Sequence, residues 1–233
     1  MKYNLEYDEF LKNKKLIRKI IEILDREYPN SKCDLKYSNG IQLLVAVQLS
    51  PRTTDNLVNK VTENMFKDLK SVHDFAIIPI EKLEDYIKPT GFFRNKAENI
   101  SNASKMIRNK YKSVVPDNLK DLISLPGIGR KIANVVLGNL YNQPTIAVDT
   151  HVFRVCSRIF FNQILPPSNK SLNQMEYFLL KHVPIESQVK FCHQIIKHGR
   201  KLCNKNPKCT ICHLKKYCNL SNTTFNRPTK FFE

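Results

Sequence analysis

The apolar residues of this chain recur at the spacing of helices. In segment 16–24, leucines and isoleucines recur every three or four positions, and alanines and isoleucines do the same in segment 97–107. This spacing places them on one face of a helix. No segment alternates as a half-buried strand does, so we predict an all-α fold. Further helices are predicted at 41–50, 53–66, 80–88, 117–124, 129–140, 149–161, 171–182 and 187–201.

No apolar run is long enough to cross a membrane. The longest, 41–49, falls well short of the roughly 18 residues that a transmembrane helix needs. The first ten residues carry acids where a secretory signal has a basic patch and an apolar run. The 233 residues, 42% of them hydrophobic, suffice for one large domain or two small ones. We therefore expect a globular protein with no membrane partner, located in the cytoplasm and associated with the nucleoid if it is bacterial.

The charge balance favours a polyanionic partner. Lysine and arginine outnumber the acids by 38 to 21, which gives a formal net charge of +17. Nucleic acid is the commonest such partner, because lysines that replace its counterions release them to solvent. A merely solvated basic surface gives the same total. Charge alone therefore indicates nucleic acid without establishing it.

The stretch LPGIGRKIANVVLG, residues 125–138, places two glycines between two predicted helices. Glycine permits positive φ and lets backbone amides converge, and amides at a helix N-terminus bind phosphate. We expect Leu122, Leu125 and Ile128 to pack the helices together and leave these amides facing outward. This pattern indicates a helix-hairpin-helix motif, which holds DNA by its backbone without reading sequence. The alternative is a tight helical turn without a ligand. The predicted DNA contacts of the hairpin are Gly127, Ile128, Gly129 and Arg130.

Lys131 and Asp149 are the candidate catalytic residues. The helix dipole and the neighbouring Arg130 disfavour the ammonium form of Lys131, which makes its amine easier to prepare for attack. Such an amine forms a Schiff base with a carbon electrophile, and a nearby carboxylate takes up its proton. The other interpretations are a phosphate clamp for Lys131 and a helix N-cap for Asp149, which precedes a predicted helix.

Four of the seven cysteines are concentrated near the C-terminus, in a C-x5-C-x2-C-x5-C pattern. A chain without a secretory signal keeps its thiols reduced, so a metal centre is more plausible here than a disulfide framework. Four thiolates suit either zinc or a [4Fe–4S] cluster. The candidate ligands are Cys203, Cys209, Cys212 and Cys218, whereas Cys33, Cys156 and Cys192 are expected in the core.

The hairpin, the segment PTIAVDTHVFRV and the cysteine cluster together resemble the endonuclease III family of DNA glycosylases, from about residue 14 to 220. The resemblance implies two helical domains, one of them a six-helix barrel that contains the hairpin. The other joins the N-terminal helix to the C-terminal helices and a [4Fe–4S] cluster. The expected divisions are 32–143 for the barrel, 1–31 with 144–220 for the cluster domain, and 221–233 for a mobile tail.

The resemblance also implies roles for single residues. Lys131 matches the nucleophile that attacks C1′ of a damaged pyrimidine nucleotide flipped out of the duplex, and Asp149 matches the carboxylate that activates it. The expected activity is therefore that of a bifunctional glycosylase and abasic-site lyase. Its substrate is double-stranded DNA with an oxidised pyrimidine or an abasic site, and we expect a monomer. Near the cluster, Lys205 and Lys208 are expected to contact phosphates.

Three positions depart from the family pattern or refine it. The first gap between cysteines has five residues instead of the usual six, which puts the geometry of that loop in question. Arg52, in LSPRTTD, replaces the glutamine that fills the space of the flipped base. As a pure donor, arginine favours acceptors and hence guanine opposite the lesion, although a phosphate contact is an equal alternative. Phe92 matches the family's apolar wedge, and either it or Phe93 is expected in the core.

Two other functions compete with this one. A monofunctional mismatch glycosylase of the same superfamily uses the aspartate to activate water, but such enzymes lack a lysine at the position of Lys131. A non-enzymatic module would use the hairpin to bind DNA and zinc to stabilise its end. Strand cleavage that requires Lys131 excludes the non-enzymatic module.

Overall fold

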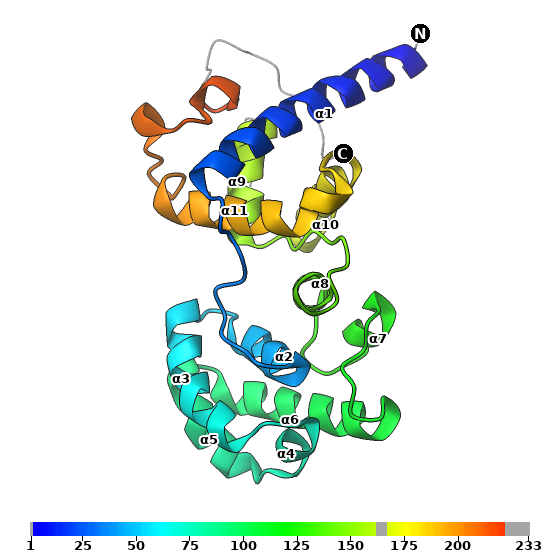
Figure 1. Cartoon of the computed structure of the whole chain (residues 1–233), viewed down its shortest axis with the longest axis vertical. Coiled ribbons are helices and arrows are strands. Elements are labelled where there is room, and N and C mark those ends of the chain that lie inside the picture. Colours follow the sequence, from blue (N-terminus) through cyan, green and yellow to red (C-terminus); the bar gives the residue numbers. More distant parts are fainter. Residues whose placement is uncertain (1, 162–166, 222–233) are drawn as a thin grey trace. The chain divides into compact units, whose positions relative to one another are not determined.

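The computed structural model describes residues 2–161 and 167–221, with side chains from residue 11 onward. All regular elements in these ranges are helical, which confirms the predicted fold class (Figure 1). The chain forms two compact units: unit 1 comprises Met1–Lys32 with Pro144–Glu233, and unit 2 comprises Cys33–Gln143. Most of the predicted tail, residues 222–233, lies outside the described residues. No helix in the described part is long and apolar enough to span a membrane.

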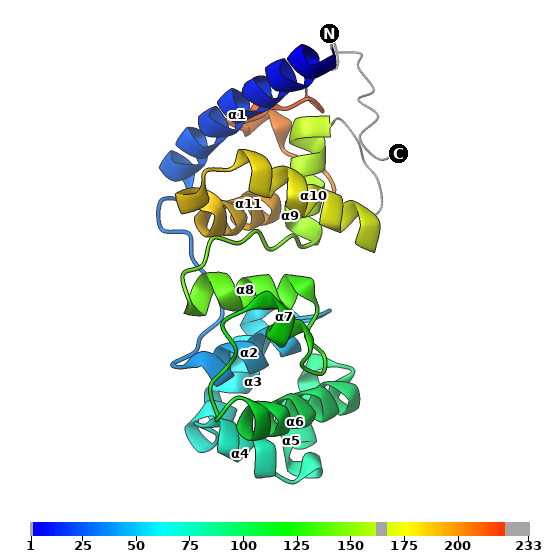
Figure 2. The ribbon, with the colours of Figure 1, turned by 90° about the vertical axis from the view of Figure 1, so that its right-hand side faces the viewer.

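Unit 2 is built around helix α2 (Gly40–Leu49), whose residues 41–49 are all buried. Helix α2 packs against α3, α6 and α8, and α6 lies alongside α4 and α5 (Figure 2). Most helices begin at a side-chain cap: Asn39 caps α2, Thr54 caps α3 and Asn118 caps α7. The other elements of this unit are α3 (Asp55–Asp68), α4 (Val72–Ile77), α5 (Ile80–Ile87), η1 (Lys88–Thr90), α6 (Phe93–Lys110), α7 (Leu119–Ile123) and α8 (Arg130–Leu140).

Helix α4 was not predicted, because six residues are too few to show a helical period. Its start nevertheless carries a local signal. Ser71 accepts a hydrogen bond from the backbone of Asp74, and the Asp74 carboxylate accepts one from the backbone of Ser71, which is a capping box.

Unit 1 joins the two ends of the chain through a shared core. Helix α1 (Lys2–Glu27) buries Ile17, Ile20 and Leu24 completely, which confirms the apolar face predicted there. Polar bonds connect α1 to α11: Nζ of Lys190 lies 2.5 Å from Oδ1 of Asp25. The remaining elements are α9 (Thr150–Cys156), the π-helical turn η2 (Ser157–Phe161), α10 (Asn169–His182), η3 (Ile185–Ser187), α11 (Gln188–Lys201), η4 (Cys209–Ile211) and η5 (Lys215–Tyr217).

Candidate active site and DNA-contacting loops

The turn between α7 and α8 has the predicted form of a hairpin. Its N–H at Ile128 donates to the carbonyl of Leu125 at 3.2 Å, and Gly127 has φ +73°. Proline followed by a glycine at positive φ is the signature of a type II turn. Leu122, Leu125 and Ile128 are buried as predicted, at 0%, 2% and 5% exposure. The apolar residues of the turn therefore pack into the core, whereas Gly127 and Gly129 are exposed.

Only one of the two glycines needs a left-handed backbone. Gly129 has φ −91° and ψ 172°, an extended conformation that any residue adopts. It is the N-cap of α8 without a side-chain bond, and a Cβ added to it would meet nothing within 4 Å. What glycine provides at this position is therefore open space beside the first amides of α8.

Gln48 fixes the hairpin to the centre of unit 2, a role that was not predicted from the sequence. Its side-chain Nε2 donates to the carbonyl of Pro126 at 3.0 Å. Gln48 is only 5% exposed and lies on α2, the most deeply buried helix of the unit. A glutamine inside the apolar run IQLLVAVQL was the available signal, because a buried polar side chain needs a specific partner.

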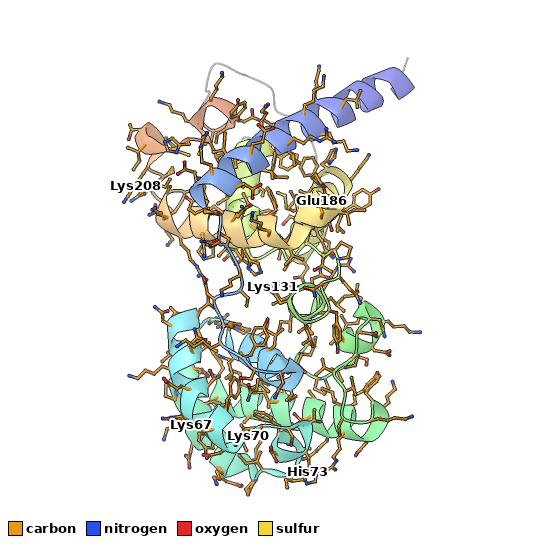
Figure 3. The ribbon with its side chains drawn as sticks, in the orientation of Figure 1. Lys67, Lys70, His73, Lys131, Glu186 and Lys208 are labelled. Atoms are coloured by element: carbon orange, nitrogen blue, oxygen red, sulfur yellow. The ribbon has the colours of Figure 1, made fainter. Side chains whose placement is uncertain are left out.

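Lys131 lies in the first turn of α8, directly after the hairpin (Figure 3). Its side chain is exposed, and so is that of Arg130 before it, whereas Ile132 and Ala133 after it are buried. Ile132 and Ala133 pack into the core of unit 2, and this orientation of α8 leaves the amine of Lys131 facing solvent. An exposed amine at a helix N-terminus has the access that a nucleophile requires.

Asp149 is the N-cap of α9, as its position before a predicted helix indicated. Its Oδ1 accepts a hydrogen bond from the backbone N–H of Val152 at 2.7 Å. The side chain is half-buried, and Oδ2 takes no part in the capping bond. Asp149 belongs to unit 1, whereas Lys131 belongs to unit 2.

Arg52 and Phe92 come together in unit 2, at the tips of two loops. Both have left-handed backbones, with φ 59° and φ 50°, and both are exposed, Phe92 by 65%. The guanidinium carbon of Arg52 lies 5.0 Å from the centre of the Phe92 ring, which is within cation–π distance. Phe93 is partly buried against the core, so the expected division of this pair is confirmed.

The four clustered cysteines line one cavity in unit 1. The cavity has a volume of about 20 Å³, and Ile159, Leu214 and Leu220 add apolar walls. All four are free thiols, and backbone N–H groups donate to the sulfurs of Cys212 and Cys218. Among the described residues, no three His, Cys, Asp or Glu side chains are arranged to hold a single metal ion. The four cysteines thus share one lined space.

The shortened loop after Cys203 is held by two arginines that were not singled out from the sequence. Arg158, only 4% exposed, donates from NH1 to the carbonyl of Asn204 at 2.6 Å and to Sγ of Cys203 at 3.3 Å. Arg154 donates from Nε to the carbonyl of Cys203 at 3.1 Å. These bonds fix the backbone at the start of the loop. Lys205 and Lys208 are both exposed on this loop, and Figure 3 labels Lys208.

The other three cysteines and two histidines have structural surroundings. Cys156 and Cys192 are buried in the core of unit 1, as expected, and Cys33 is half-buried against that of unit 2. His198 accepts or donates a bond at 3.2 Å with the hydroxyl of Tyr28, and burial lowers its pKa to about 4. His151 bonds to NH2 of Arg154 at 3.0 Å.

Comparison with known proteins connects these features to one family. The pattern described as "HhH-GPD superfamily base excision DNA repair protein" matches residues 45–179. Endonuclease III of Buchnera aphidicola subsp. Acyrthosiphon pisum (strain APS) is 41% identical over 91% of this chain and 100% of its own length. Endonuclease III of Bacillus subtilis (strain 168) is 39% identical over 88% of this chain and 93% of its own.

Solved structures agree in fold and in sequence. A trapped endonuclease III–DNA covalent intermediate, in an estranged-adenine complex, superposes with a TM-score of 0.83 at 38% identity. The alignment covers 91% of this chain and 98% of that one. A thermostable thymine-DNA glycosylase shares the fold, with a TM-score of 0.80 at 22% identity. The chain therefore belongs to the endonuclease III family within the HhH-GPD superfamily of base excision DNA repair proteins.

Proposed function

We propose that Lys131 and Asp149 carry out the excision of oxidised pyrimidines from duplex DNA and the cleavage of the strand that follows. As a member of the endonuclease III family, the chain is a bifunctional DNA glycosylase and abasic-site lyase that acts on DNA. The observation that supports the proposal best is the position of Lys131, an exposed amine in the first turn of α8 next to the hairpin. There a phosphate on the hairpin amides brings the sugar of the same nucleotide within reach of the amine.

The amine of Lys131 forms a bond to C1′ as the bond from C1′ to the base breaks and the base leaves with a proton. Loss of a proton from nitrogen and opening of the sugar give a Schiff base between Lys131 and C1′. This cation acidifies the proton on C2′. Removal of that proton expels the phosphate oxygen from C3′, which cuts the strand on the 3′ side, and water then releases the lysine.

Asp149 accepts the proton of the attacking amine and stabilises the positive charge that develops at C1′. A carboxylate is required for both tasks, whereas capping α9 requires only an acceptor for the Val152 N–H. An asparagine side chain in its place would cap the helix equally well, so Asp149→Asn separates the two functions of this residue. We expect the variant to keep the stability of the native protein and to lose base excision.

We propose that the cysteine cavity holds a [4Fe–4S] cluster, with Cys203, Cys209, Cys212 and Cys218 as its ligands. Zinc requires four sulfurs that converge at about 2.3 Å on one ion, whereas a cluster is larger and occupies the space between them. Donors to sulfur from Arg158 and from the backbone suit thiolate ligands. When bound, the cluster supplies structural support for a loop that presents Lys205 and Lys208 to phosphates. Iron and sulfide analysis of purified protein tests this assignment against zinc.

Arg52 and Phe92 are proposed to enter the duplex at the flipped nucleotide. Phe92 stacks where the base was removed, and the guanidinium of Arg52 donates to acceptors on the orphaned base, with guanine preferred.

We further propose that the protein works as a monomer in the cytoplasm. Sedimentation of the protein alone and bound to a short duplex tests the monomeric state.

Borohydride trapping tests the catalytic proposal directly. Native protein, Lys131→Gln and Asp149→Asn are each mixed with a duplex carrying an oxidised pyrimidine or an abasic site. Native protein is expected to form a covalent adduct with both duplexes, Lys131→Gln with neither, and Asp149→Asn with the abasic duplex alone. An adduct with Lys131→Gln would show that another amine attacks. No adduct with native protein, despite DNA binding, would make Lys131 a phosphate clamp.

A further inference from the structure

Lys96 is a buried lysine whose three hydrogen-bond acceptors are all uncharged. It lies in the first turn of α6 and is only 7% exposed, and burial lowers the pKa of its ammonium group. Lysine is almost never fully buried unless its charge is compensated. Its Nζ donates to the carbonyl of Leu49 at 2.8 Å, to the carbonyl of Thr90 at 3.0 Å and to Oγ1 of Thr53 at 3.0 Å. The three donors of the ammonium group are thus matched by three acceptors.

These acceptors come from three separate segments. Leu49 is the last residue of α2, where the helix dipole favours a positive charge. Thr53 lies in the loop that carries Arg52, and Thr90 ends η1, just before the loop that carries Phe92. The hydroxyl of Thr53 also donates to the carbonyl of Thr90 at 2.8 Å. Lys96 and Thr53 therefore tie the two loops to each other and to α2.

Each of the two loops carries one residue with a strained, left-handed backbone. Non-glycine residues at positive φ are strained and persist only where their surroundings fix them. Arg52 and Phe92 are both in this class, and their side chains meet at 5.0 Å. Both side chains are exposed, so burial cannot fix their position. The bonds of Lys96 lie one residue from Arg52 and two from Phe92 and supply that constraint.

We propose that Lys96 is a positioning residue: its ammonium group fixes the two loops so that Arg52 and Phe92 enter the DNA duplex as one preformed unit. This inference rests on the proposed function, in which those two residues replace the flipped nucleotide. A single-stranded abasic site needs no such insertion, because no partner base must be held apart. Loss of Lys96 should therefore slow base excision from duplex DNA more than strand cleavage at an abasic site in a single strand.

The test compares two reactions of the same preparation, under single-turnover conditions. One is base excision from a duplex with an oxidised pyrimidine, and the other is strand cleavage at an abasic site in a single strand. Lys96→Met keeps the length of the side chain without its charge. It is expected to slow duplex excision by about 10- to 100-fold, the effect of a misplacement near 1 Å, and to change single-strand cleavage by less than about twofold.

Lys105→Met is the matched control, because it removes an exposed lysine from the same helix and the same unit of charge. It should leave the ratio of the two rates unchanged. A fluorescent 2-aminopurine opposite the lesion reports insertion directly, and Lys96→Met should abolish its increase on binding. Thr53→Val removes the hydroxyl that links both loops, without leaving a cavity at the lysine, and should shift the ratio in the same direction.

If Lys96→Met and Thr53→Val leave the ratio of duplex excision to single-strand cleavage unchanged, the inference is overturned. Lys96 would then only cap the C-terminal end of α2. If Lys96→Met fails to fold, Thr53→Val decides alone. The proposed function fails in a different way, because native protein would then excise no base and form no trapped adduct.

Discussion

Replacing each glycine of the hairpin by alanine should separate the contribution of this turn to stability from its contribution to DNA affinity. At Gly127, φ is +73°, and an alanine Cβ would lie 2.8 Å from Cβ and 2.9 Å from Cγ of Asn99. At Gly129 the backbone is extended, and the added Cβ would meet nothing within 4 Å. The same substitution is therefore blocked at one position and sterically free at the other.

The cost at Gly127 has two parts. A left-handed backbone costs a residue with a side chain about 1–2 kcal/mol. The contact with Asn99 adds about 1–3 kcal/mol, because the Cβ of Asn99 is fixed by its own backbone and cannot rotate away. The reduced freedom of the unfolded chain returns about 0.4–1 kcal/mol. Gly127→Ala should thus lower the free energy of unfolding by about 1–5 kcal/mol, a substantial share of the roughly 5–15 kcal/mol typical of proteins.

Gly129→Ala should cost less than about 1 kcal/mol, the difference between the two residues at an N-cap. Its methyl group, however, projects beside the amides that would hold a phosphate. We expect the affinity for an undamaged duplex to fall about tenfold at fixed salt, equivalent to about 1.4 kcal/mol. Urea unfolding followed by circular dichroism and fluorescence anisotropy with labelled duplex measure the two quantities.

Asn99→Gly supplies the internal check on the calculation. It removes the side-chain atoms that the methyl group of Gly127→Ala would contact. The glycine inside the helix lowers the free energy of unfolding by about 1 kcal/mol in its own right. The double variant should recover the contact cost but not the backbone cost. Native stability in Gly127→Ala would refute the steric reasoning, and native DNA affinity in Gly129→Ala would refute the hairpin as a phosphate site.

Three further predictions concern other parts of the molecule. Arg52→Gln should remove the preference for guanine opposite the lesion, and an unchanged ratio of excision rates across the four opposite bases would make Arg52 a phosphate contact. Backbone N–H groups of Lys70 and Ser71 hold the pKa of Asp74 below its ordinary value. The stability that its carboxylate adds is complete above about pH 4 and is lost as the pH falls through the lowered pKa. Asp74→Ala should therefore cost about 1 kcal/mol near neutral pH, and urea unfolding should show this difference shrinking toward about pH 3. Arg158→Met should release iron to a chelator faster than native protein, as measured by visible absorbance and iron content, and equal release rates would show that the loop holds itself.

The fold class and the main features of the site were predictable because they depend on local sequence. A helical period is visible in a window of a few turns, so every α-helix among the described residues was predicted at least in part except the six-residue α4. The type II turn at Pro126 and Gly127 and the capping bond of Asp149 each involve residues three apart or less. Local rules of turn and cap chemistry suffice for such features.

The residues that hold the site in place could not be found in this way. Lys96 bonds to Leu49 across 47 positions, Gln48 to Pro126 across 78 and Arg158 to Cys203 across 45. In the sequence, each is one polar residue among many, and even where the surrounding run is apolar, as around Gln48, nothing local indicates which group the side chain bonds to. Burial makes an unmade hydrogen bond costly, and only the packing of distant helices determines which polar groups are buried and which acceptors reach them. The sequence alone thus determined the helices, the hairpin and the candidate catalytic residues, whereas the tertiary structure decided which side chains hold these features in position.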